Sequence, residues 1–73
     1  MSLQIKLKKL AEELSKLLKD SNLETVDKDV LENSQEELQK AVLFLADEKG
    51  SEHTAAELID NLKEVIAKLK ANA

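Results

Sequence analysis

The sequence predicts an all-α fold, a three-helix up-down-up bundle that forms one domain over residues 1–73. In three segments, apolar residues recur at spacings of three and four, which is the pattern of a helix with one apolar face. The chain has one glycine and no proline, so only short polar links interrupt these segments. It also has no cysteine, so a domain of this size must be stabilised by helix packing rather than by disulfides. We therefore expect helices over about residues 2–19, 27–49 and 54–70.

The first segment carries a leucine stripe with nearly heptad spacing. Ser2 is the expected N-cap, because its hydroxyl can accept a hydrogen bond from a free backbone N–H of the first turn. The polar link Asp20-Ser21-Asn22 is expected to end the helix, since short polar side chains compete for backbone hydrogen bonds. The core positions of this segment are Leu3, Leu7, Leu10, Leu14 and Leu17, flanked by Ala11 and Leu18.

The second segment begins at Asp27, another good N-cap. Val26, directly before it, is expected to pack on Leu31 as a hydrophobic staple. Gly50 is expected to stop the helix, with Lys49 complementing the negative end of the helix dipole. The residues expected on one face are Val30, Leu31, Ser34, Leu38, Ala41, Val42 and Leu45.

Ser34 leaves two interpretations of this segment open. With Glu37 it forms a capping-box pattern, which would divide the segment into a short and a longer helix. Alternatively, the hydroxyl bonds back to the carbonyl of Val30 within one helix. The apolar stripe keeps its phase across Ser34, so we expect one continuous helix.

The third segment begins at Ser51 or at Thr54, whose Glu57 completes another capping box. We place the helix over residues 54–70 and expect residues 71–73 to fray. Its apolar stripe is wide enough to touch two neighbouring helices. The stripe consists of Ala55, Leu58, Ile59, Leu62, Val65, Ile66 and Leu69.

Charged residues mark the solvated faces and divide unevenly along the chain. Residues 1–20 have net charge +2, residues 21–50 have −5, and residues 51–73 have −1. This distribution fits either complementarity within the bundle or attraction of a cationic partner to the second helix. Four acid-to-lysine pairs have the favourable i,i+4 order: Glu12–Lys16, Glu24–Lys28, Glu36–Lys40 and Glu64–Lys68.

The residue types argue against catalysis and against a metal or cofactor site. His53 is the only histidine, and with Glu57 it supplies two ligands where a structural zinc needs four. A lone imidazole with no orienting partner does not activate a nucleophile. One glycine cannot build a phosphate-binding loop. We therefore expect a protein that is not an enzyme and has no cofactor.

Composition also bounds the partners and the location. The chain has no Arg, Trp or Tyr and a net charge of −4, which argues against nucleic acid binding. No apolar run is long enough for a transmembrane segment, and the start MSLQIKLKKL does not read as a secretory signal peptide. We expect a cytoplasmic protein, and the sequence leaves peripheral membrane contact open.

Three apolar residues break the pattern of the stripes. Leu43 and Ile5 point about 160° and 170° away from the centres of their stripes, at 100° per residue. Phe44, the only aromatic residue, lies about 100° from its stripe. An outward apolar pair on an acidic helix is typical of a contact with a partner helix or a second copy. Leu43, Phe44 and Ile5 are therefore the predicted contact residues for a protein partner or for self-association.

Several stretches between about residues 10 and 70 share helix lengths and residue types with a known family. They are Glu13–Leu18, Asp29–Glu32, Glu37–Ala41, Gly50 and Ala56–Leu62. This arrangement resembles the helical core of small bacteriocin immunity proteins of the enterocin A immunity type. Those proteins are cytoplasmic helical bundles of low-GC lactic acid bacteria that protect the producer from its own membrane-active peptide. The resemblance implies a non-catalytic protective protein, and no functional residue carries over from it.

Two other interpretations remain open. The restricted set of residue types, the regular apolar stripes and the repeated acid-to-lysine pairs are typical of a designed or simplified three-helix bundle without biological function. The irregular link over residues 20–26, the outward Leu43 and Ile5, and the lack of Trp and Tyr argue against design. The other interpretation is a generic oligomerisation or interaction domain.

Overall fold

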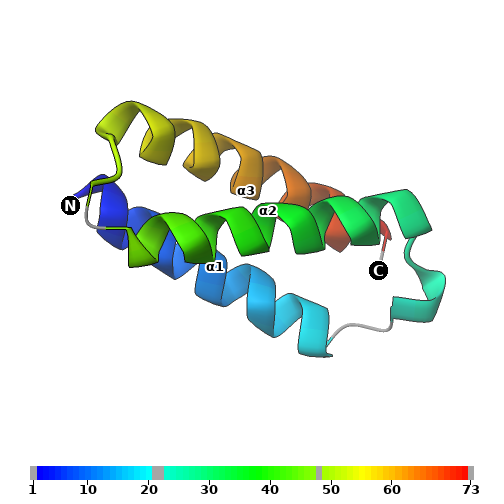
Figure 1. The fold of residues 1–73 in the computed structure, drawn as a ribbon. Coiled ribbons are helices and arrows are strands. Elements are labelled where there is room, and N and C mark those ends of the chain that lie inside the picture. Colours follow the sequence, from blue (N-terminus) through cyan, green and yellow to red (C-terminus); the bar gives the residue numbers. More distant parts are fainter. Residues whose placement is uncertain (1, 21–22, 48, 73) are drawn as a thin grey trace.

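A computed structural model describes residues 2–20, 23–47 and 49–72 and confirms the three-helix up-down-up bundle. The elements are α1 (Leu3–Asp20), the short 3₁₀ helix η1 (Leu23–Thr25), α2 (Lys28–Ala46) and α3 (Glu52–Asn72). Helices α1 and α3 run in the same direction and α2 runs against both (Figure 1). The described residues contain no strand.

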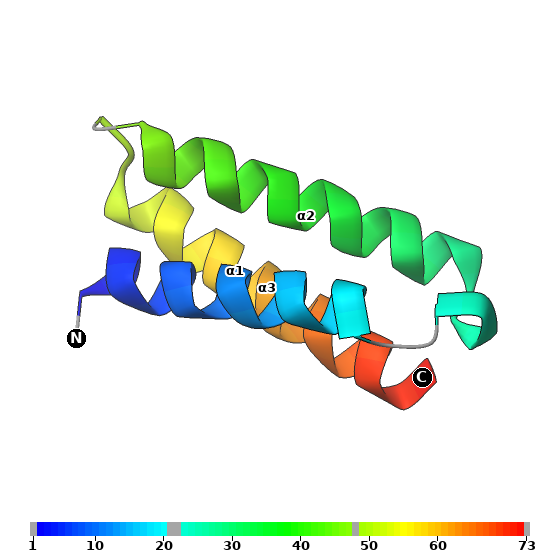
Figure 2. The ribbon, with the colours of Figure 1, turned by 90° about the horizontal axis from the view of Figure 1, so that it is seen from below.

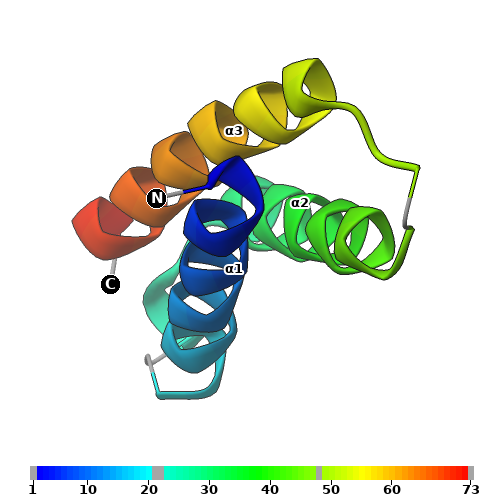
Figure 3. The ribbon, with the colours of Figure 1, turned by 90° about the vertical axis from the view of Figure 1, so that its left-hand side faces the viewer.

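The two ends of the bundle hold different parts of the chain. The beginnings of α1 and α3 and the end of α2 lie at one end, whereas η1 and the ends of α1 and α3 lie at the other (Figure 2). Viewed from the first of these ends, the helices occupy the corners of a triangle (Figure 3). Each helix therefore packs against both others and keeps one face in solvent.

Helix α1 begins as predicted. The backbone N–H of Ile5 donates to Oγ of Ser2 at 3.2 Å, and the N–H of Lys6 donates to the Ser2 carbonyl at 3.1 Å. Ser2 is thus the N-cap, and it satisfies one of the donors that the first turn leaves free. The helix continues to Asp20, one residue beyond the predicted end.

Helix α2 begins as predicted but ends earlier. Asp27 caps it, accepting a hydrogen bond from the N–H of Asp29 at 3.4 Å. The predicted end at residue 49 is wrong, because α2 stops at Ala46. The side chain of Asp47 accepts a hydrogen bond from the N–H of Lys49 at 3.0 Å, and this turn competes with a further turn of helix. Gly50 therefore lies in the connection to α3 and is not the cap.

Ser34 lies inside one continuous α2, as expected. Its hydroxyl donates to the carbonyl of Val30 at 2.8 Å, and the residue is fully buried. The alternative of two helices separated at Ser34 is wrong. Because the hydroxyl is satisfied within its own helix, the buried polar side chain needs no partner from α1 or α3.

Helix α3 is longer than predicted at both ends. It begins at Glu52 rather than at residue 54, because Ser51 is the cap: its Oγ accepts from the N–H of Thr54 at 3.2 Å. At the other end α3 includes Ala71 and Asn72, so these two residues are helical rather than frayed. The predicted fraying of residue 73 lies outside the described residues.

The core is distributed unequally over the three helices. All seven stripe residues of α3 are buried, with exposed fractions of at most 7%. Helix α1 adds Leu7, Ala11 and Leu14, and Val26 is buried before α2. Helix α2 contributes Ser34, Glu37 and Ala41 as its buried residues, and Ala41 alone of these is apolar. The bundle is thus well packed on α3 and less so on α2.

The face that α2 turns inward differs from the predicted one. Its buried residues centre on the line of Ser34, Glu37 and Ala41, about 45° from the centre of the predicted stripe at 100° per residue. This rotation carries Val42, which was predicted to face the core, outward to 54% exposure. It also brings Glu37 inward, which the sequence did not indicate.

Ion pairs lie on the surface of the bundle. The predicted pair of Glu64 and Lys68 forms, with 3.3 Å between Oε1 and Nζ. Lys40 pairs with Glu37 at 3.4 Å rather than with the predicted Glu36. Nζ of Lys70 on α3 also reaches Oε1 of Glu13 on α1 at 3.2 Å. Glu37 is itself buried, but the pairs of Lys68 and Lys70 are exposed and each contribute at most about 1 kcal/mol, so they accompany the fold and do not determine it.

Candidate functional site

His53 forms a surface pair with Glu57. Its Nε2 lies 3.0 Å from Glu57 Oε1, one turn further along α3, and the two side chains are 84% and 63% exposed. Within residues 2–20, 23–47 and 49–72, no three His, Cys, Asp or Glu side chains gather closely enough to hold a metal ion. This pair therefore stabilises a helix surface and has no further ligand beside it.

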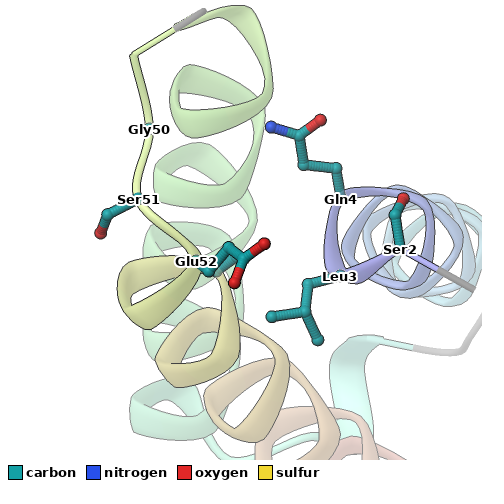
Figure 4. A pocket seen from close by; sticks show the side chains of 7 residues that line it. Ser2, Leu3, Gln4, Gly50, Ser51 and Glu52 are labelled. Carbon is teal, nitrogen blue, oxygen red and sulfur yellow. The ribbon is translucent and has the colours of Figure 1, made fainter.

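A pocket of about 200 Å³ lies where α1 and α3 begin (Figure 4). Leu3 and Gln4 of α1 and Glu52 of α3 point into the space between the helices, whereas the Ser51 side chain points away from it (Figure 4). The hydroxyls of Ser2 and Ser51 act as helix caps. The carboxylate of Glu52 opposes the binding of an anion at these helix N-termini. The Glu52 carboxylate is thus the one acid–base side chain in the lining of this pocket, and it has no second such group beside it there.

A second hollow, of about 290 Å³, lies between α1 and α3. Its floor is formed by Leu10 and Ile59, and its edges carry Lys6, Lys9 and Lys63. Ile59 is buried and Leu10 is half-buried, so no strongly exposed apolar side chain marks this hollow. We interpret it as the ordinary contact between two packed helices, where the aliphatic parts of lysine side chains cover apolar surface.

The predicted contact residues do not all behave alike. Leu43 is 65% exposed and Ile5 is 49% exposed, so both point into solvent as expected. Phe44 is half-buried, and its ring lies against Gly50 and packs on the core. The 45° rotation of α2 explains this difference, since Phe44 lies on the side that turns inward. Val42, beside Leu43, takes the outward position that was expected of Phe44.

One of these exposed side chains, Val42, lines a groove between α1 and α2 with a volume of about 280 Å³. We call this hollow the α1/α2 groove. Leu43 follows Val42 in the sequence but points about 100° further round α2. Ile5 precedes Lys8 by about one turn of α1 and lies outside the lining. The groove is lined by Lys8, Ala11, Glu12, Ser15, Leu38, Val42 and Leu45.

The large apolar residues of α2 are incompletely covered. Five of them pack on the core but remain half-buried: Val30, Leu31, Leu38, Phe44 and Leu45. Leu38 and Leu45 lie in the α1/α2 groove, where Val42 is exposed. Covering this groove would remove apolar surface from water, and each Å² buried contributes about 25 cal/mol of favourable free energy.

Between residues 35 and 46 the solvent side of α2 beside the groove carries no charge, whereas Lys28 and Glu32 lie on the same side nearer the start of the helix. The five exposed residues that follow one another along this stretch of the helix surface are uncharged, although charged residues make up 36% of the chain. They lie within about 100° of arc on the helix, at 100° per residue. Depletion of charge around exposed apolar residues is characteristic of the core of a protein–protein interface. We call this set the uncharged strip: Gln35, Gln39, Val42, Leu43 and Ala46.

Glu37 is the one charged residue of α2 that is buried, at 8% exposure. Its Oε1 accepts from Nζ of Lys40 at 3.4 Å, whereas its Oε2 is buried and has no hydrogen-bond partner among the described groups. Lys40 is 61% exposed, so its ammonium remains hydrated. A half-satisfied buried carboxylate costs stability and does not by itself form a site.

Comparisons with protein-family models, with curated proteins and with solved structures found no match to this chain. Among the described helices, none is long and apolar enough to cross a membrane. The exposure of Val42 above the half-buried Leu38 and Leu45 makes the α1/α2 groove with the uncharged strip the candidate functional site. The sequence correctly predicted that Ile5 and Leu43 are exposed but missed the exposure of Val42, because Val42 also fits the helical spacing of a core residue.

Proposed function

We propose that this chain is a non-catalytic protein-binding helical bundle whose contact surface is the α1/α2 groove together with the uncharged strip. One observation carries the proposal: three large apolar side chains, Ile5, Val42 and Leu43, are about half exposed or more along one pair of helices. Single exposed apolar residues are ordinary, but Val42 lies beside the half-buried Leu38 and Leu45, and such a cluster is typical of a binding surface.

The proposal is tested by placing a photo-crosslinking amino acid at position 43 in the cells that make the protein. Position 61 on α3 is the matched control, because Asn61 is exposed and lies on a helix whose stripe is fully buried. We expect protein adducts from position 43 and none of the same mass from position 61. Equal labelling at both positions, or no protein adduct at 43, would contradict the proposal.

A narrower form of this proposal is protection against a bacteriocin, which the resemblance of residues 10–70 supports. The experiment is expression of the chain in a bacteriocin-sensitive strain that is then exposed to the peptide. Survival that disappears with Leu43→Glu would support both the protective function and the groove. Unchanged killing by a panel of such peptides would overturn the protective function and leave the general binding proposal to the crosslinking test.

A further inference from the structure

We infer that α2 has two packings in this bundle, related by a rotation of about 45° about the helix axis, and that the contact of Phe44 with Gly50 holds the observed one. In the observed packing the line of Ser34, Glu37 and Ala41 faces the core. In the second packing the centre of the apolar stripe of α2 faces the core instead. The rotation does not depend on the proposed function, whereas its consequence for the α1/α2 groove rests on it.

The observed packing of α2 carries two costs. It buries Glu37, whose Oε2 has no hydrogen-bond partner among the described groups. It also leaves Val42 54% exposed and leaves Leu38 and Leu45 half-buried. An unpaired buried carboxylate oxygen and incompletely covered apolar side chains both raise the free energy of a packing. These costs narrow the margin by which the observed packing is favoured.

The reverse rotation relieves both costs. It brings Leu38 and Leu45 to within about 20° of the direction that faces the core, at 100° per residue. Val42 moves from about 105° to about 60° away from that direction. Glu37 moves from about 35° to about 80° away from it, where its carboxylate reaches water. The second packing thus buries more apolar surface of α2 and hydrates its buried carboxylate.

Phe44 opposes this rotation. Its half-buried ring packs on the core and lies so close to Gly50 that no Cβ fits there. The rotation carries Phe44 to about 100° from the direction that faces the core, so the ring leaves both Gly50 and the core. An aromatic ring carries a large apolar surface, and exposing it is costly. The contact of Phe44 with Gly50 therefore stabilises the observed packing against the second one.

The rotation acts as a switch of the α1/α2 groove. Helix α2 lines that groove with Leu38, Val42 and Leu45, and in the second packing all three turn towards the core. The apolar part of the proposed binding surface is then withdrawn from solvent. Helices shift in this way between two discrete arrangements because packed interfaces do not deform continuously. A partner of the groove binds the observed packing and shifts the population towards it.

Thiol labelling tests the rotation in the full chain without any partner. The chain has no cysteine, so Val42→Cys and Leu43→Cys each introduce a single reporter thiol. Position 43 is the matched control, because it points about 150° or more away from the core in both packings. Phe44→Gln is then added to each, since it removes the ring that holds the observed packing. We expect the labelling rate at position 42, relative to that at position 43, to fall by about threefold or more, as the observed packing loses population.

Two further substitutions complete the test. Glu37→Leu favours the observed packing, because leucine gains by facing the core, so adding it to the Phe44→Gln variants should restore the ratio of the two rates. Gly50→Ala disturbs the same contact without changing α2 and should lower the ratio as Phe44→Gln does. Far-UV circular dichroism shows whether the variants keep their helix content.

Three outcomes would overturn the two packings. They are an unchanged ratio in either folded variant, a lowered ratio that Glu37→Leu does not restore, and loss of helix content in both Phe44→Gln and Gly50→Ala. In the last case the contact would hold the fold together rather than choose a packing. Protein adducts from position 43 in cells without a rotation would retain the proposed function, whereas a rotation without adducts would retain the two packings alone.

Discussion

The ring of Phe44 occupies the space that a side chain at Gly50 would need. A Cβ at position 50 would lie 2.6 Å from Cζ of Phe44, closer than real carbon atoms approach. Gly50 has no positive φ, so its backbone does not require glycine. The close approach of the ring, and not the backbone conformation, therefore opposes a side chain at position 50.

Gly50→Ala tests this relationship. The added methyl group forces the half-buried ring of Phe44 to shift, and we expect the free energy of unfolding to fall by about 1–3 kcal/mol. Alanine also restricts the unfolded chain, which opposes the loss by less than about 1 kcal/mol. Urea denaturation measures the change. In a Phe44→Leu background the same substitution should cost less, because the ring is gone. Equal costs in the two backgrounds would contradict the contact.

Glu37→Leu is expected to stabilise the protein by about 1–2 kcal/mol. The substitution removes a buried carboxylate oxygen that has no hydrogen-bond partner and places apolar atoms against the core. Lys40 loses a partner but stays hydrated, so that loss is small. Thermal unfolding measures the effect, and Glu36→Leu at an exposed position should stay within about 0.5 kcal/mol of the parent. A destabilised Glu37→Leu would show that the pair with Lys40 outweighs the cost of burial.

The start of α3 is tested by comparing two alanine substitutions. Ser51→Ala removes the oxygen that accepts from the N–H of Thr54, and we expect a loss of about 1 kcal/mol in unfolding free energy. Thr54→Ala removes a hydroxyl that only accepts from Ser51, so a much smaller loss is expected. Chemical denaturation of both variants under the same conditions gives the comparison. A larger loss of unfolding free energy for Thr54→Ala than for Ser51→Ala would place the cap at Thr54.

Much of this fold could be predicted, because caps and stripes are local signals. Ser2 and Asp27 cap their helices as their side-chain chemistry indicates, and all seven stripe residues of α3 are buried. The end of α2 was missed because Asp47 forms a turn through its own side chain, and this competes with the stop signal of Gly50. Helix ends depend on such small differences more than helix interiors do.

The candidate site was only partly predictable, because it depends on how far α2 turns about its own axis. A rotation of about 45° moves Val42 outward and Phe44 inward, although the same residues remain helical. The pattern of α2 is ambiguous, since Leu31, Leu38 and Leu45 define one stripe centre while Ser34 and Ala41 define another. Packing against the broad stripe of α3 decides between the two, and that choice is not local.

The small and polar inward line of α2 also has a consequence for how the molecule opens. Helices α1 and α3 hold most of the buried leucine, isoleucine and valine, whereas α2 is held by alanine, serine and half-covered leucines. Amide protons of α2 should therefore exchange with deuterium through a partial unfolding that leaves α1 and α3 paired. Any molecule seated on the groove would slow that exchange in α2 first, so protection of this one helix reports occupancy even before the occupant is isolated.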